Sequence, residues 1–372
     1  MSDTTNTKAT FKSESILQKR IKNFKRIKRG YYSLIIITIA YFLSFLAPLF
    51  VNNKALVVKY SGSYYFPAMG DLLGEGVVKH KDAIFYGQEE VFGEKRYGEP
   101  HYRELKKQFK QQNAGNWVLM PLYDYSPVEN LLSELKSNPP TAPDSKHIMG
   151  TDNRGRDVFA RLVYGFQISL SFALVVTFFS FLIGIMIGGS LGFYAGKLDL
   201  YGLRFIEIFS MIPFLFVMMI LSSFINPSFW MLAGMLIILG GWIGATYYMR
   251  GEFYREKSRD YTAAAIAMGA SDRMVMFKHI LPNAITPIIT LAPFSIIGNI
   301  SSLVALDFLG FGLRPPTPSW GELIRQGVTE DISNWWLIVT PLFMIFLTLT
   351  TITFIGEGVR QAFDPREYSR LQ

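Results

Sequence analysis

The side chains that could carry chemistry are few in this chain and stand apart from one another. The sequence has no cysteine, which excludes disulfides, thiolate catalysis and cysteine metal sites. Gly196-Lys197 is followed by Leu198 rather than by Ser or Thr, which argues against a phosphate-binding P-loop. The four histidines lie outside the apolar runs, and each is expected to be a surface residue: His80, His101, His147 and His279. We therefore predict no catalytic residue, no metal and no cofactor in this chain.

A polar segment between two apolar runs is the strongest functional signal. It reads DYTAAAIAMGASDRMVMFKHILPN from Asp260 to Asn283. The sequence predicts one helix over Glu252–Met268, ended by Gly269 because glycine adopts the left-handed conformation at little cost. Three small residues would give that helix a smooth face for the backbone of a partner: Ala263, Ala264 and Ala265.

A second helix is predicted directly after this turn. Ser271 is a good N-cap, Asp272 suits the first turn of a helix, and Pro282 ends the segment. The predicted apolar stripe of this helix consists of Met274, Phe277 and Leu281. Such a pair of helices suits docking into a groove of another protein. From the residues alone, a docking element and a plain connector between membrane helices are equally supported.

The apolar runs that flank this segment define the fold class. Half of the 372 residues are hydrophobic, and apolar runs of about 20 residues are typical of transmembrane helices. We predict an all-α polytopic membrane protein with six spans. They are Ser33–Val51, read as a retained signal anchor, and then Ile168–Tyr194, Phe205–Ile225, Phe229–Met249, Ala284–Leu309 and Trp335–Ile355.

The distribution of lysine and arginine predicts the orientation of these spans. Basic residues are concentrated in the leader 1–32, in the loop 250–283 and in the tail 359–372, so these parts and both termini are expected in the cytoplasm. The net charge of +8 lies mostly beside membrane segments, which argues against a nucleic-acid partner.

The segment 52–166 is expected outside the cytoplasm as a small mixed α/β domain between the first two spans. Its predicted elements are a hairpin over Ala55–Pro67, a helix over Tyr102–Gln112, a strand within Trp117–Tyr125 and a rigid spacer over Asn138–Asp144. We favour a cap on the outer mouth over a surface that meets a partner or substrate. Next to the membrane, His147–Gly165 is predicted to form a short interfacial helix, entered through Gly150-Thr151-Asp152.

A few residues within the spans could take part in transport. Pro213 and Met218 give the third span a kinked, pliable character that is compatible with a gate, although ordinary helix packing is favoured. Asp307, near Gly310 and Gly312, could cap a loop or face a translocation path. Glu207 is expected to pair with Arg204 one turn away.

The polar segment resembles the EAA loop of type I ABC importer permeases. The matching residues are Ala264, Ala265, Gly269, Leu281 and Pro282. Ala263 stands where that family has Glu, and His279 stands where it has Ile, as in the F-K/R-H-I-L-P-N form of peptide importers.

Three further motifs resemble dipeptide and oligopeptide permeases. They are HIMGTDNRGRDVFARLVYG before the second span, FLGFGLRPPTPSWGEL over Phe308–Leu323 and GEGVRQAFDPR over Gly356–Arg366. ALVVKYSGSYYFP and ALDFLGFG resemble the branch that imports microcin C and related peptides. Four motifs in one order make the resemblance cover most of the chain.

This resemblance implies a binding-protein-dependent importer of the bacterial inner membrane. Residues 167–358 would form the permease core and half of the translocation pathway. The implied partners are a second, different permease, cytoplasmic ATPase subunits that hydrolyse the ATP, an external solute-binding protein, the lipid bilayer and a peptide substrate. The residues expected in the ATPase-coupling loop are Asp260, Tyr261, Ala263, Ala264, Ala265, Gly269, Ser271, Asp272, Phe277, Leu281 and Pro282.

Two other functions fit the sequence less well. A self-sufficient secondary transporter or channel would favour paired repeats and acidic residues near the membrane midplane, and the sequence shows neither. A membrane enzyme or sensor that uses segment 52–166 would need a nucleophile and base, or a metal cluster, and no such pattern stands out there.

Overall fold

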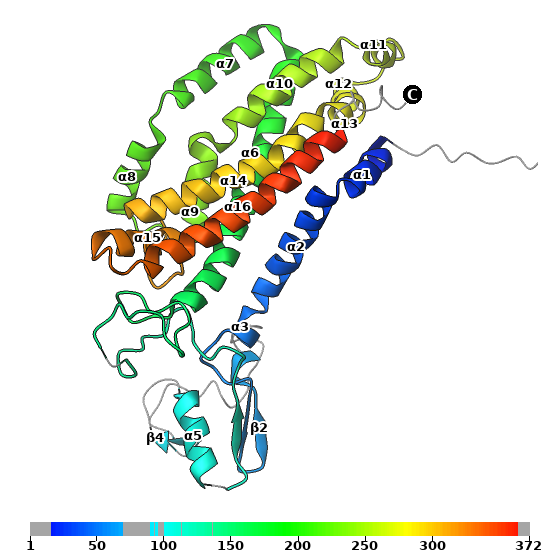
Figure 1. The fold of residues 1–372 in the computed structure, drawn as a ribbon. Helices are drawn as coiled ribbons and strands as arrows, with labels where there is room; N and C mark the ends of the chain where they lie inside the picture. The colour runs from blue at the N-terminus through cyan, green and yellow to red at the C-terminus, as the bar shows by residue number, and fades with distance from the viewer. Residues whose placement is uncertain are drawn as a thin grey trace, which may run out of the picture.

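A computed structural model describes residues 16–69, 90–92, 94–95, 100–112, 114–135 and 137–363. The described chain is a bundle of long helices with a small sheet at one end (Figure 1). The predictions made for residues 1–15 of the leader, for His80 and for residues 364–372 lie outside the described residues.

Three helices are long and apolar enough to cross a membrane: α6 (Val158–Tyr194), α14 (Thr286–Leu309) and α16 (Trp336–Phe363). Two bent pairs would raise the number to five among the described residues if each pair is one span. The first pair is α7 (Gly196–Ser210) with α8 (Phe214–Phe224), bent by 64°. The second is α9 (Phe229–Leu236) and the π-helix η2 (Ile237–Gly241), followed by α10 (Ile243–Lys257) at 45°.

The first predicted span corresponds to α2 (Lys28–Phe45) and the short α3 (Ala47–Phe50). α2 begins with Lys28 and Arg29, and it is not among the three helices that are long and apolar enough to cross a membrane. Before it, α1 (Ile16–Arg26) is a basic amphipathic helix that packs beside the end of α16 (Figure 1).

Proline explains the break between α7 and α8. Pro213 has no backbone N–H to donate and occupies the N-cap position of α8, while Met211 and Ile212 form a turn before it. The predicted kink at Pro213 is confirmed, and it divides the third predicted span into two helices.

Close approach of backbones joins α6 to α10. Gly184, Gly188 and Gly192 lie one helical turn apart on α6 and face α10. A Cβ atom added at Gly192 would lie 2.5 Å from the carbonyl oxygen of Arg250, so only glycine fits there. The two helices therefore pack as one unit along most of the length of α10.

At the opposite end from the C-terminus of α10, a three-stranded antiparallel sheet has the order β2-β1-β5 (Figure 1). Its strands are β1 (Val57–Tyr60), β2 (Ser63–Tyr65) and β5 (Trp117–Leu119), and α5 (Tyr102–Gln112) packs on one face of it. The short strands β3 (Glu90–Val91) and β4 (Glu94–Lys95) pair separately. The structure thus contains the predicted hairpin, the predicted helix and a strand in the third predicted position.

The separate interfacial helix predicted within His147–Gly165 is wrong. Val158 is the first residue of α6, and the Asp157 side chain caps that helix by accepting a hydrogen bond from the Ala160 N–H at 2.9 Å. Residues 147–157 form turns instead. Because the amphipathic stretch Val158–Leu162 continues directly into the apolar run, one 37-residue helix forms.

Candidate functional site

The predicted docking segment forms a compact knob of short helices after α10. The first is α11 (Asp260–Ala267), and the prediction of one continuous helix over Glu252–Met268 is wrong. The chain breaks at Ser258 and Arg259, and the Thr262 hydroxyl donates to the carbonyl oxygen of Glu256 at 2.8 Å. This bond turns α11 back against the end of α10.

Gly269 ends α11, as predicted, with a φ angle of +82°. No atom would lie within 4 Å of an added Cβ, so the backbone angle alone favours glycine. Ser271 occupies the N-cap position of α12 (Asp272–Met274), and no side-chain capping bond forms there. The π-helix η3 (Val275–Ile280) and α13 (Leu281–Ala284) complete the knob.

The inner face of the knob packs on the membrane helices. Val275, Met276 and Ile280 are buried in a cluster with Met249 and Phe253 of α10. The predicted stripe of Met274, Phe277 and Leu281 is therefore not one face: Met274 and Phe277 are exposed, whereas Leu281 is half-buried. Hydrogen bonds of the i→i+5 type in η3 change the residue spacing on which the stripe was based.

The outer face of the knob is apolar and open. Met268 is 81% exposed, Phe277 62%, Ile266 49% and Met274 47%. A cleft of about 470 Å³ lies between α11 and α12, lined in part by Met268, Gly269 and Met274. Large apolar side chains grouped on a polar segment mark an interaction surface. We call these four side chains and the cleft the docking patch.

The other predicted residues of the loop divide between this outer face and the interior. Six are exposed: Asp260, Ala263, Ala264, Ser271, Asp272 and Pro282. Ala265 is buried, so its small size serves packing within the chain. Tyr261 is partly exposed, and its hydroxyl donates to the Glu256 carboxylate at 2.7 Å. Burial, together with this hydrogen bond, raises the pKa of Tyr261.

Ion pairs fix the helix that carries the knob. The Arg250 guanidinium donates to both oxygens of Asp199 at 2.5 and 2.6 Å, and the Tyr254 hydroxyl donates to the same carboxylate at 2.6 Å. Lys257 donates to the carbonyl oxygen of Phe193 at 2.5 Å. α10 is thereby tied to the start of α7 and to the end of α6.

The residues singled out within the spans have defined surroundings. Asp307 is buried and accepts hydrogen bonds from the Leu313 N–H at 2.6 Å and the Ser319 hydroxyl at 2.5 Å. These bonds favour the interpretation that Asp307 caps the loop after α14 over the interpretation that it faces a translocation path. Met218 is fully buried among residues of neighbouring helices, and Glu207 pairs with Arg204 at 2.6 Å on the surface, as expected.

A buried ionic cluster was missed by the sequence analysis. Arg161 at the start of α6 donates to Glu322 of α15 (Trp320–Thr329) at 2.5 Å, and Arg156 binds Asp152 at 2.6 Å and Glu322 at 3.3 Å. All four side chains are at most 4% exposed. Glu322 lies more than 160 residues from both Arg156 and Arg161 in the sequence. The only local sign of the cluster was the alternation of Asp and Arg over residues 152–161.

His147 belongs to the same end of the molecule, and the prediction that it lies on the surface is wrong. It is 3% exposed, and its Nδ1 lies 2.9 Å from Asp157. The Tyr123 hydroxyl donates to Asp157 at 2.6 Å. Burial, reinforced by the charge of Asp157, raises the pKa of Tyr123 well above its usual value.

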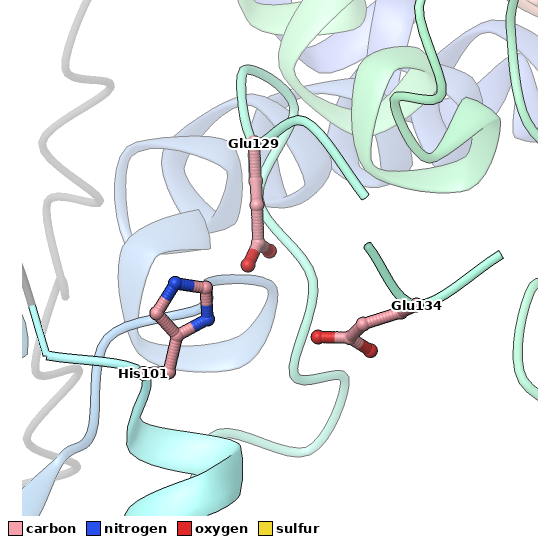
Figure 2. Close-up of side chains that lie close together, drawn as sticks. All are labelled: His101, Glu129 and Glu134. Carbon is pink, nitrogen blue, oxygen red and sulfur yellow. The ribbon is translucent and has the colours of Figure 1, made fainter. Parts of the chain in front are cut away.

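One group of side chains has the composition of a metal site. Figure 2 shows His101, Glu129 and Glu134 converging from separate segments. The Arg103 guanidinium, however, donates to both oxygens of Glu129 at 2.7 and 3.0 Å and to Glu134 at 2.6 Å. Burial alone would lower the pKa of Arg103, but these two carboxylates outweigh it and raise that pKa. The group is therefore an ion-pair hub that holds α5 to residues 124–134.

Comparison with known proteins agrees with this architecture. Residues 180–367 match the family described as "Binding-protein-dependent transport system inner membrane component". The chain is 37% identical to the inner membrane ABC transporter permease protein YejE of Escherichia coli K12, over 94% of this chain and 97% of that protein. It is 35% identical to the peptidoglycan transport system permease protein YejE of Agrobacterium fabrum, over 95% and 94%.

Two more distant similarities were found. The chain is 32% identical to the dipeptide transport system permease protein DppC of Bacillus subtilis, over 73% of this chain and 86% of that protein. Among solved structures, it is similar to a chain of the inward-facing MetNI methionine ABC transporter, with 20% identity and a TM-score of 0.43. That similarity covers 55% of this chain and 97% of the other.

Proposed function

The chain belongs to the family of inner-membrane components of binding-protein-dependent transport systems, and we propose that it couples to its ATPase through the 252–282 loop. It is a multi-pass membrane protein and a permease subunit of an ATP-driven peptide importer. The observation that carries the coupling proposal is the docking patch, because its large apolar side chains are open on a loop that is firmly tied to α6 and α7.

ATP is hydrolysed, in this proposal, by a separate subunit. The Gly196-Lys197 pair lacks the residues that complete a P-loop, so the energy of transport would have to reach this chain mechanically. The knob would dock into a groove of the ATPase, with Met268 and Phe277 in contact with the walls of that groove. Ala263 and Ala264 leave room for close approach of backbones, and no acidic side chain is present at position 263 to form a salt bridge.

A second, different permease would cover the outer side of α7 and α8. These helices make few contacts within the described chain and expose a continuous series of large apolar side chains: Ile208, Met211, Phe216, Ile220 and Phe224. The translocation path would lie between the two subunits. Pro213 and Met218 would then allow α8 to tilt at its junction with α7, as a gate requires.

The sixth span and the orientation complete the proposal. α2 would be the first of six spans, with its basic end in the cytoplasm together with the docking patch and both termini. The segment 52–166, with its small sheet, would then lie outside as a cap that faces the solute-binding protein. Two of the relatives are named for transport of dipeptides and of peptidoglycan, so we propose a peptide or a peptide-bearing cell-wall fragment as the substrate.

Reconstitution distinguishes this function from a self-sufficient transporter. The full chain would be placed in proteoliposomes with its sister permease, the ATPases and the binding protein, and uptake of a labelled tripeptide would be measured. We expect uptake that requires ATP, and its loss when the P-loop lysine of the ATPase is replaced. Uptake by this chain alone, driven by a proton or sodium gradient, would instead establish the secondary transporter.

A further inference from the structure

A second cavity, of about 490 Å³, opens beside the knob. It is lined by residues of α1, the end of α10, the start of α11, α13, the start of α14 and the end of α16. Figure 1 shows α1 beside the end of α16. Three arginines and two glutamates line it together with the ring of Phe363: Arg20, Arg255, Arg259, Glu252 and Glu256.

The charges in this cavity are unevenly matched. Arg255 forms ion pairs with both Glu252 and Glu256, and the three arginines of the cavity exceed its two glutamates by one positive charge. Glu256 also accepts the hydrogen bond of Tyr261.

The other two arginines have no carboxylate partner among the described residues. Arg20 donates to the neutral Thr286 hydroxyl at 2.8 Å and lies 4.9 Å from the centre of the Phe363 ring. Arg259 is exposed at the turn between α10 and α11. Both arginines line the cavity, and a phosphate group can accept hydrogen bonds from the planar guanidinium of each.

The position of the cavity indicates which phosphate it would meet. α1 directly precedes α2, so the cavity lies at the level where the chain enters the membrane. Exposed basic side chains continue around α1 and the start of α2: Lys19, Lys25, Arg26, Lys28 and Arg29. Basic clusters beside the cytoplasmic end of a transmembrane helix bind anionic lipid headgroups. Phe363 and Pro287 supply apolar surface for the glycerol and the start of the acyl chains.

We infer that this cavity binds the phosphate of an anionic phospholipid from the cytoplasmic leaflet. The inference rests on the proposed orientation, in which the basic end of α2 faces the cytoplasm. A lipid bound there would touch Arg259, the residue that precedes α11, and would hold the base of the docking loop in one position. The lipid would thereby favour the arrangement of the loop that engages the ATPase.

Native mass spectrometry of the full-length chain in lipid nanodiscs tests the inference. We expect phosphatidylglycerol to stay bound in preference to phosphatidylcholine. The double variant Arg20→Gln/Arg259→Gln should weaken phosphatidylglycerol binding about thirtyfold, since each basic residue near an anionic lipid contributes about a fivefold factor. The matched control Arg273→Gln/Lys278→Gln removes the same charge from exposed positions on the knob, outside the cavity and away from the basic residues of α1 and α2, and should retain most of the binding.

Three results would overturn the inference. One is equal retention of the two lipids by the unaltered chain. Another is an equal loss of binding in both double variants, which would mean a general attraction of the basic surface. The third is displacement by soluble glycerol phosphate at millimolar concentration, which would identify a water-soluble ligand instead. If the double variant unfolds, Arg259→Gln alone serves, because that side chain is exposed.

The measurement needs neither ATPase nor peptide, so its failure leaves the transport function untouched.

Discussion

Removal of the docking patch should separate the permease from its ATPase without unfolding it. Complete burial of a Phe or Met side chain is worth about 1.5–3 kcal/mol. Phe277 is 62% exposed and Met268 81%, so docking can recover about 1–2 kcal/mol from each by the same scale. The variant Met268→Ala/Phe277→Ala should therefore bind the ATPase about 30-fold to 700-fold more weakly.

The assay is titration of fluorescently labelled ATPase onto the permease complex in nanodiscs, with ATP-driven peptide uptake measured in parallel. A matched control is Leu122→Ala/Ile332→Ala, which removes two apolar side chains that are 92% and 76% exposed and lie outside the knob. Neither variant should change thermal stability appreciably, because exposed substitutions shift it by only about 0.5 kcal/mol. If ATPase affinity of the patch variant stays within about twofold of the unaltered complex, the docking patch does not bind the ATPase.

Four further predictions concern the surroundings of the patch and the outer end of the molecule. Glu322→Ala leaves Arg156 and Arg161 buried and poorly paired, so it should cost about 3–5 kcal/mol in a denaturant titration, whereas exposed Glu330→Ala should cost little. Gly188→Val should lower stability by about 1–3 kcal/mol or more by forcing α6 and α10 apart, while Gly298→Val, which meets open space, serves as the control. Gly269→Val should destabilise the end of α11 by about 1–2 kcal/mol, seen as faster hydrogen exchange there, and Gly251→Val should leave that region unchanged. The pKa of Tyr123 is raised in the folded chain, so its protonated phenol stabilises the fold; this contribution is fully present below pH 10.0 and is lost as the pH rises above that value. Tyr123→Phe should therefore reduce the alkaline loss of stability in melting curves, and an unchanged loss would contradict the assignment.

The sequence alone predicted the structure correctly wherever a single residue type determines the local backbone conformation. Gly269 ends α11 because its φ is positive, and Pro213 breaks the third span because proline cannot donate a backbone hydrogen bond. The bounds of α5, Tyr102–Gln112, coincide with those predicted from its composition. In each case the deciding physics lies within a few residues of the element.

Tertiary contacts decided the features that the sequence did not reveal. The alanines after Asp260 favour a helix that continues from α10, yet the bonds from Tyr261 and Thr262 back to Glu256 require a turn before them. The exposed stripe was displaced because η3 does not keep the spacing of an α-helix. Glu322 and Arg161 meet only after the chain has folded over more than 160 residues, so no local pattern predicts their pairing.

The contacts of α10 indicate how a push on the docking patch would reach the membrane helices. The glycines of α6 bring its backbone into close contact with α10, so no layer of side chains separates the two helices. The two hydrogen bonds from Arg250 to Asp199 hold the start of α7 to α10. The chain is kinked at Gly240 within η2, just before α10, and it forms the π-helix η3 after α12; kinks and π-helices are places where helices change geometry. Motion of the knob is therefore expected to carry α10, α6 and the start of α7 together, with the change of shape taken up at η2 and at the α7–α8 junction. Asp199, which is outside the docking patch, links the start of α7 to this motion through its bonds to Arg250.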